Sequence, residues 1–235
     1  MRTLSSGLAL DAMRNAALSV LPPQVPRAVI VYGSFGRMQQ KPTSDLDVLF
    51  IGDNTPRALA ELTSVLIAFS HCHGLPLDEE VPYANKLLVD WEELSAASTC
   101  DVFAGSPRLT TVRRGDPCFL SSDYMRSRLL VTGVLAQRTL GWSEDPLRLD
   151  SLRARAGAGL VRAAFDDVRS ADADPDVEAV VDYITGEKGG ILAADWLGFD
   201  PDPATRRHLS GFAEYVLHTS RFDRKFRSAT SDVAL

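Results

Sequence analysis

Cysteine is scarce in this sequence. The 235 residues include three, Cys72, Cys100 and Cys118, which lie far apart along the chain. An odd number of widely spaced cysteines argues against a disulfide framework, and a reducing cytoplasm fits this pattern. Long apolar runs are also missing: no stretch approaches the roughly 20 apolar residues of a membrane helix. Residues 1–12 lack the basic start and long apolar run of a secretory signal. We therefore expect a cytoplasmic protein without a membrane segment.

Positive charge is also in short supply. The sequence has 25 Lys and Arg residues against 31 Asp and Glu residues, for a net charge of −6. This balance argues against a nucleic-acid binder that relies on a basic surface. It does not exclude a nucleotide, because a metal ion can neutralise the phosphates locally. The 45% of hydrophobic and 24% of charged residues are typical of a globular chain.

Two short apolar runs, joined by a polar connection, form the most informative part of the sequence. They are Ala28–Tyr32 and Val48–Ile51. The first run breaks at Gly33, and the second follows two acidic residues. This pattern predicts a strand, a Gly-Ser turn into a short helix, a loop and a second strand.

The two acidic residues before the second run are Asp45 and Asp47. Because side chains in a strand alternate between its faces, these carboxylates should point the same way, and Leu46 should point into the core. Two carboxylates on one face repel each other unless a cation lies between them. Mg²⁺ commonly takes one or two carboxylates together with substrate phosphates. The pair therefore predicts a magnesium site.

The residues after the first run predict a phosphate site. Gly33 lets the backbone approach a ligand closely. Ser34 adds a hydroxyl, and the N–H groups at the start of the next helix can bind an anion. Arg37 lies one helical turn after Ser34, so both side chains can face the same anion. A phosphate site beside a metal site suits phosphoryl or nucleotidyl transfer.

Residues 33–37, Gly-Ser-Phe-Gly-Arg, followed by residues 44–47, Ser-Asp-Leu-Asp, resemble the signature of the polymerase-β-type nucleotidyltransferase superfamily. That group includes aminoglycoside and lincosamide nucleotidyltransferases and small two-component nucleotidyltransferases. The resemblance covers residues 28–52. It implies a mixed sheet with helices, two Mg²⁺ ions, ATP or another nucleoside triphosphate as co-substrate, and Ser44 among the nucleotide-binding residues. The alternative is a glycine turn followed by two surface aspartates.

A third acid should complete the metal site, because the superfamily uses a third carboxylate on a neighbouring strand. Residues 75–81 read as a third strand, on which Asp78 and Glu80 share a face. Asp78 is the first choice as the partner of Asp45 and Asp47. Glu80 is the second choice, and its longer side chain could instead act as the base for the acceptor hydroxyl.

Glycines and prolines around residues 104–117 predict a domain boundary. We assign residues 1–115 to a nucleotidyltransferase domain and residues 116–235 to a helical substrate-binding domain. Strand signals fade beyond the boundary. Helices are expected at 8–20, 56–70, 91–97, 121–139, 147–169, 177–184, 191–197 and 203–218, and a further strand at 86–90.

Some polar groups outside the motif allow a chemical interpretation. Residues 71–73, His-Cys-His, could suggest a metal site, but favourable placement of His at a helix C-terminus explains them better. Asp182 and Glu187 could supply a base from the helical half, although a solvated surface position is expected for both.

The predicted architecture is an α/β nucleotidyltransferase half followed by a helical bundle, with substrate in the cleft between them. The proportions resemble those of the antibiotic-modifying members. The first hypothesis is a nucleotidyltransferase that moves AMP from ATP to a hydroxyl of a small molecule, such as an aminoglycoside-like antibiotic, and releases pyrophosphate. The second is a protein AMP-transferase of a toxin–antitoxin type. The third is a nucleotide-binding or scaffold protein without catalysis. The sequence leaves the oligomeric state open.

Overall fold

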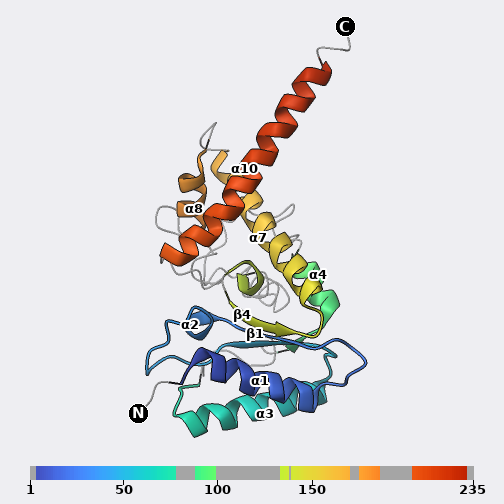
Figure 1. Ribbon diagram of the computed structural model, residues 1–235, viewed down its shortest axis with the longest axis vertical. Coiled ribbons are helices and arrows are strands. Elements are labelled where there is room, and N and C mark those ends of the chain that lie inside the picture. The colour runs from blue at the N-terminus through green and yellow to red at the C-terminus, as the bar shows by residue number, and fades with distance from the viewer. Residues whose placement is uncertain are drawn as a thin grey trace, which may run out of the picture.

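A computed structural model describes residues 4–77, 88–98, 133–137, 139–169, 175–185 and 203–231 (Figure 1). In these parts of the chain a four-stranded mixed sheet lies between two groups of helices, with the strand order β3-β2-β1-β4. The strands are β1 (Ala28–Val31), β2 (Val48–Ile51), β3 (Leu88–Val89) and β4 (Leu140–Ser143). β1 is antiparallel to β2 and β4, and β2 is parallel to β3. The expectation of an α/β fold with a mixed sheet is confirmed.

The two central strands are buried on both faces, which explains why they read as continuous apolar runs. All four residues of β1 and all four of β2 are buried. Their side chains alternate between two cores. Val29 and Phe50 belong to the core on one face, whereas Ile30 and Leu49 belong to the core on the other.

Helices α1 (Ser6–Val20) and α3 (Pro56–His73) cover one face of the sheet (Figure 1). Each begins at a residue whose side chain caps the free N–H groups of the first turn. The Ser5 hydroxyl accepts from the Leu8 N–H, and the Thr55 hydroxyl accepts from the Ala58 N–H. α3 ends at His73 and is capped by Gly74, and residues 71–73 lie in its last turn, as predicted.

The other face is covered by α4 (Trp91–Ser98) and α7 (Pro146–Arg169). α8 (Val177–Thr185) and α10 (Pro203–Ser231) pack against α7 on the side away from the sheet (Figure 1). The apolar side chains of this face form one continuous core, in which Ile30 and Leu49 of the sheet join Leu152 of α7 and Leu209 of α10. The helical half therefore packs directly on the sheet.

The fourth strand, β4, lies within residues 116–235, where only helices were expected. Residues 133–136 are helical, but the expected helix does not extend to Thr139, and β4 pairs with the free edge of β1 from Ala28–Ser143 to Val31–Leu140. β4 contains Gly141 and is only partly buried, so it lacks the apolar pattern of a central strand. Its pairing depends on a partner far away in the sequence.

Several expected boundaries also change. α10 continues to Ser231, beyond the predicted end at residue 218. Residues 75–77 are not in a strand, and the rest of the predicted strand at 75–81 lies outside the described residues, as do the helix at 191–197 and the domain boundary at 104–117. Within the described residues, no helix is long and apolar enough to cross a membrane.

Candidate functional site

The end of β1 meets the residue before β2 at Gly33 and Asp47. The Tyr32 N–H donates to the Asp47 carbonyl at 3.1 Å, which extends the strand pairing one step beyond Val31 and Val48. Gly33 then turns with a φ of 59°, a left-handed conformation that favours glycine. A Cβ at Gly33 would overlap the Oδ2 of Asp47. Glycine thus allows the backbone to lie directly against this carboxylate, and the two halves of the motif are in contact.

The expected burial of Leu46 between the two aspartates is confirmed. Leu46 is 6% exposed and lies in the core beneath α1 and α3. Asp45 and Asp47 on either side of it are half-buried. Since Val48 points into that core and the pairing with β1 extends to Asp47, the Asp47 carboxylate belongs to the opposite face, which also carries Leu49. This is the face covered by α4 and α7.

The carboxylate pair fits one part of a magnesium site. Mg²⁺ commonly takes one or two carboxylates together with phosphate oxygens of a substrate, and Asp47 lies beside the close backbone approach at Gly33. Among the described residues, no group of three His, Cys, Asp or Glu side chains comes together. Asp78 and Glu80, predicted to supply the third carboxylate, lie outside the described residues.

The predicted phosphate-binding residues lie on α2 (Gly33–Gly36) and at its end. Ser34 and Arg37 are both half-buried, and the Arg37 N–H donates to the Gly33 carbonyl at 3.2 Å. A helix of one turn has little macrodipole, because few peptide dipoles add up. Individual N–H donors matter more: a helix offers no internal acceptor for the N–H groups of its first turn, here including Ser34 and Phe35. An anion at this position would meet separate donors rather than a strong helix terminus.

The loop from α2 to Asp45 is held by side chains near its middle. The Ser44 hydroxyl accepts from the Lys41 N–H at 2.9 Å, and the Ser44 N–H donates to the Lys41 carbonyl at 3.0 Å. Gln40 accepts a hydrogen bond from the Ser6 hydroxyl at 3.2 Å. Met38 adopts a left-handed φ of 59°, which is uncommon for a residue with a Cβ. The Ser44 hydroxyl thus has a structural partner, and its role in nucleotide binding stays a prediction.

A cation that the sequence analysis missed lies on the other side of α2. Arg153 of α7 donates from Nη2 to the Thr139 hydroxyl at 2.8 Å. A Cβ at Gly36 would lie 3.6 Å from the Cα of Thr139, so the end of α2 packs against this residue. Burial lowers the pKa of the Arg153 guanidinium, and the charge of Asp150 partly opposes that effect. The sequence did contain a sign that Arg153 faces the protein interior. It falls on the same helical face as Leu149, four residues earlier, which is in the core.

Asp182 does not occupy the solvated surface position expected for it. Its side chain is buried in α8 and forms an ion pair with Arg206 of α10, with 2.5 Å between Oδ1 and Nη2. Breaking a buried pair leaves an uncompensated charge, so this contact fixes α8 against α10. Glu187 lies outside the described residues.

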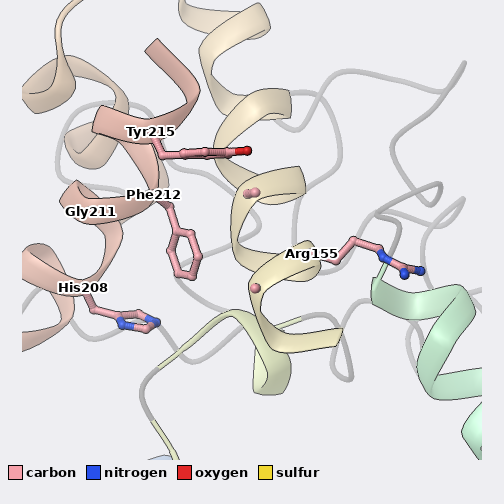
Figure 2. Close-up of a pocket in the computed structure, with 7 residues that line it drawn as sticks. Arg155, His208, Gly211, Phe212 and Tyr215 are labelled. Atoms are coloured by element: carbon pink, nitrogen blue, oxygen red, sulfur yellow. The ribbon is translucent and has the colours of Figure 1, made fainter. Parts of the chain in front are cut away.

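A groove of about 620 Å³ lies between α7 and α10 (Figure 2). His208, Phe212 and Tyr215 of α10 project towards α7, whereas Arg155 extends away from them. The His208 ring packs edge-on against Phe212, with 5.2 Å between the centroids. A second groove of about 540 Å³ lies between the start of α8 and α10. Neither groove includes a residue of the 33–47 stretch, so neither is the substrate cleft predicted between the two halves.

Comparisons of the chain with protein-family models, with curated proteins and with solved structures found no match.

Proposed function

We propose that this chain is a Mg²⁺-dependent nucleotidyltransferase, which transfers a nucleoside monophosphate, AMP from ATP in the first instance, to a hydroxyl group. One observation carries the proposal: Gly33, in a left-handed conformation, lies against the carboxylate of Asp47. A turn suited to close phosphate approach and an acidic pair suited to a hard cation therefore adjoin. Nucleotidyl transfer needs a phosphate site and a metal site in one place, because the negative charge to be stabilised lies on the phosphates of the nucleotide.

Each residue of the stretch has a role in this proposal. Asp45 and Asp47 would hold Mg²⁺, which supplies charge neutralisation for the phosphate oxygens when bound. The backbone at Gly33, the Ser34 hydroxyl and the Arg37 guanidinium would bind and orient the triphosphate. Positioning of the reactants supplies much of the rate in such reactions.

The reaction balances without a further reactant. The acceptor oxygen forms a bond to the α-phosphorus, and the bond between the α-phosphorus and its bridging oxygen breaks. Pyrophosphate leaves, and the proton of the acceptor hydroxyl passes to an acidic side chain or to water. Glu80 is our candidate for that side chain, with Asp78 completing the metal site.

The acceptor we propose is a small molecule with hydroxyl groups, of the aminoglycoside type. The net charge of −6 supports a cationic acceptor over an anionic one, because opposite charge favours encounter. A protein hydroxyl is the second candidate acceptor, and the test below separates the two.

The deciding experiment incubates the purified chain with Mg²⁺ and ATP labelled at the α-phosphate. One arm contains a panel of aminoglycosides and the other a panel of proteins. Label that moves to an aminoglycoside supports the proposal, and label on a protein supports the protein AMP-transferase alternative. The Asp45→Asn/Asp47→Asn double variant is the control for the chain's own activity. ATP binding without any transfer would favour the non-catalytic alternative, and absence of ATP binding would overturn the proposal.

The third acid has its own test. We expect Asp78→Asn to remove metal-dependent turnover, and Glu80→Gln to slow transfer and change its pH dependence. An active Asp78→Asn variant together with a Glu80→Gln variant that has lost Mg²⁺ binding would exchange the two roles.

A further inference from the structure

Three residues lie in one row where strands β2, β1 and β4 end beside α2. Tyr32 is joined to Asp47 by the backbone hydrogen bond of 3.1 Å, and the pairing of Val31 with Leu140 brings Thr139 next to Tyr32 on the other side. Neighbouring strands lie about 5 Å apart, so Asp47 and Thr139 are about 10 Å apart across this row. A ligand that lies over Gly33 is therefore flanked by Asp47 on one side and Thr139 on the other.

Arg153 is held at the Thr139 end of this row. Besides its hydrogen bond to the Thr139 hydroxyl, its Nη2 lies over β4, where a Cβ at Gly141 would come within 2.6 Å of it. Gly141 pairs with Ile30, whose side chain is on the face of the sheet that carries Leu49. Since Asp47 belongs to that same face, Arg153 and the Asp47 carboxylate lie on one side of the sheet.

Within the described residues, the half-buried guanidinium of Arg153 has no anionic hydrogen-bond partner. Within the described residues its Nε is buried without a hydrogen-bond acceptor, and no carboxylate forms an ion pair with it. Its hydrogen-bond partner among the described residues is the neutral hydroxyl of Thr139, and Asp150 acts on it through charge alone. A buried charge is costly unless it is paired. In contrast, the buried Asp182 has Arg206 as its partner.

We propose that Arg153 is a second phosphate-binding residue, which receives the polyphosphate tail of the nucleotide on the β4 side of α2. This inference rests on the proposed function, since that function supplies the anion. Arg suits the role because its planar group of several N–H donors can bond Thr139 and a phosphate oxygen together. The hydroxyl of Thr139 orients the guanidinium, so Thr139 is a positioning residue. The nucleotide tail would thus lie between Arg37 at the end of α2 and Arg153 of α7.

The test measures binding of ATP, AMP and inorganic tripolyphosphate by calorimetry, in the presence of Mg²⁺. Arg153→Gln should lower the affinity for ATP and for tripolyphosphate at least tenfold, which is the effect of one lost charge-assisted contact. Its affinity for AMP should change less. Arg153→Lys should bind with intermediate affinity, because an ammonium group is a point charge without the planar fork. Arg155→Gln removes an exposed cation two residues away and should bind all three ligands like the wild type.

Thermal unfolding supplies a second readout. Arg153→Gln should melt no lower than the wild type without ligand, since the lost cation forms no ion pair within the part of the chain that the structure describes. ATP should raise the melting temperature of the wild type and of Arg155→Gln more than that of Arg153→Gln. Thr139→Val keeps the charge and removes the orienting hydroxyl, so it should reduce tripolyphosphate affinity less than Arg153→Gln does. This variant provides the same test if Arg153→Gln fails to fold.

The outcomes separate this inference from the proposed function. Unchanged tripolyphosphate affinity in both Arg153→Gln and Thr139→Val, while Ser34→Ala weakens it, overturns the role of Arg153 alone. An Arg153→Gln variant that loses stability but binds ATP normally shows a structural anchor and also overturns it. A wild type that binds neither ATP nor tripolyphosphate overturns both.

Discussion

The two sides of α2 are built from different parts of the chain. On the β2 side, Gly33 touches Asp47, and both residues belong to one short stretch of sequence. On the β4 side, Gly36 packs against Thr139, which Arg153 reaches from α7. A local motif is enough to predict that Gly33 and Asp47 lie close together. The second side exists because a distant strand joins the free edge of β1, so it leaves no motif in the sequence.

That distant strand is held in place by an ion pair at its far end. Arg27 and Glu144 are 117 residues apart in sequence. The Arg27 Nη2 donates to the Glu144 Oε1 at 2.6 Å, and the Arg27 backbone N–H donates to Oε2 at 2.9 Å. The Glu144 N–H donates back to the Arg27 carbonyl at 2.9 Å. These contacts fix the register of β4 against β1, and with it the position of Thr139.

The largest effect should come from the acidic pair on the β2 side. Asp45→Asn and Asp47→Asn should each reduce transfer at least about 100-fold, because each removes a charge that would hold Mg²⁺. Both side chains are half-buried rather than in the core, so the fold should persist. Turnover with labelled ATP and Mn²⁺ binding by calorimetry check the two effects separately. Asp53→Asn, an exposed aspartate just after β2, is the matched control. Near wild-type turnover in either variant of the pair would remove its metal role.

The next largest effect should come from Ser34 and Arg37, the predicted phosphate-binding side chains. Ser34→Ala and Arg37→Ala should each weaken the binding of a non-hydrolysable ATP analogue by about 1.5–3 kcal/mol, the usual loss for a hydrogen bond to a charged group. Calorimetry measures this loss, and acceptor binding should change less. Lys41→Ala removes an exposed cation from the following loop and should leave the affinity unchanged. If both Ser34→Ala and Arg37→Ala bind the analogue normally, the turn at Gly33 is structural and the β4 side alone could hold the tail.

A pair of glycines tests the contact between the two halves of the motif. Gly33→Ala should lower the free energy of unfolding by about 1–3 kcal/mol, because it combines a left-handed φ with overlap of Asp47. Gly7→Ala in α1 meets no atom within 4 Å and should raise the free energy of unfolding by about 0.5–1 kcal/mol. Denaturant titration gives both values. Equal effects of the two substitutions would show that Gly33 and Asp47 do not press together in solution.

The smallest effect should appear at the Arg27–Glu144 pair. Hydrogen bonds from Arg27 hold the pKa of the Glu144 carboxyl below its usual value of 4.5. A lowered pKa in the folded state stabilises the protein above pH 4.5, and this contribution is lost as the pH falls through the folded-state pKa. Glu144→Gln should therefore lower the free energy of unfolding by about 1 kcal/mol at neutral pH, and by progressively less below pH 4.5. Unfolding titrations across this range measure the difference. Parallel curves for variant and wild type would show that the pair does not hold β4.

The fold also divides into features set by residues close in sequence and features set by distant residues. The apolar runs of β1 and β2 and the alternation at Leu46 could be predicted, because burial on a sheet leaves a period in the sequence. The cap of α3 at Thr55 could be predicted as well, since capping is a contact between near neighbours. β4 could not, because four residues with a glycine in the middle carry no clear period. The burial of Asp182 was missed for a similar reason, as its partner Arg206 lies on another helix.

The amino-acid sequence alone was sufficient for the acidic pair and the glycine turn beside it. Local sterics and strand alternation act between residues that are close along the chain, so their consequences can be read directly. The placement of Thr139 and Arg153 came from folding in three dimensions. Pairing of an edge strand depends on backbone hydrogen bonds that every sequence can make, and the partner is selected by long-range packing and by the ion pair at Glu144. Such contacts have no fixed spacing along the chain, and for that reason the β4 side of α2 became visible only in the folded protein.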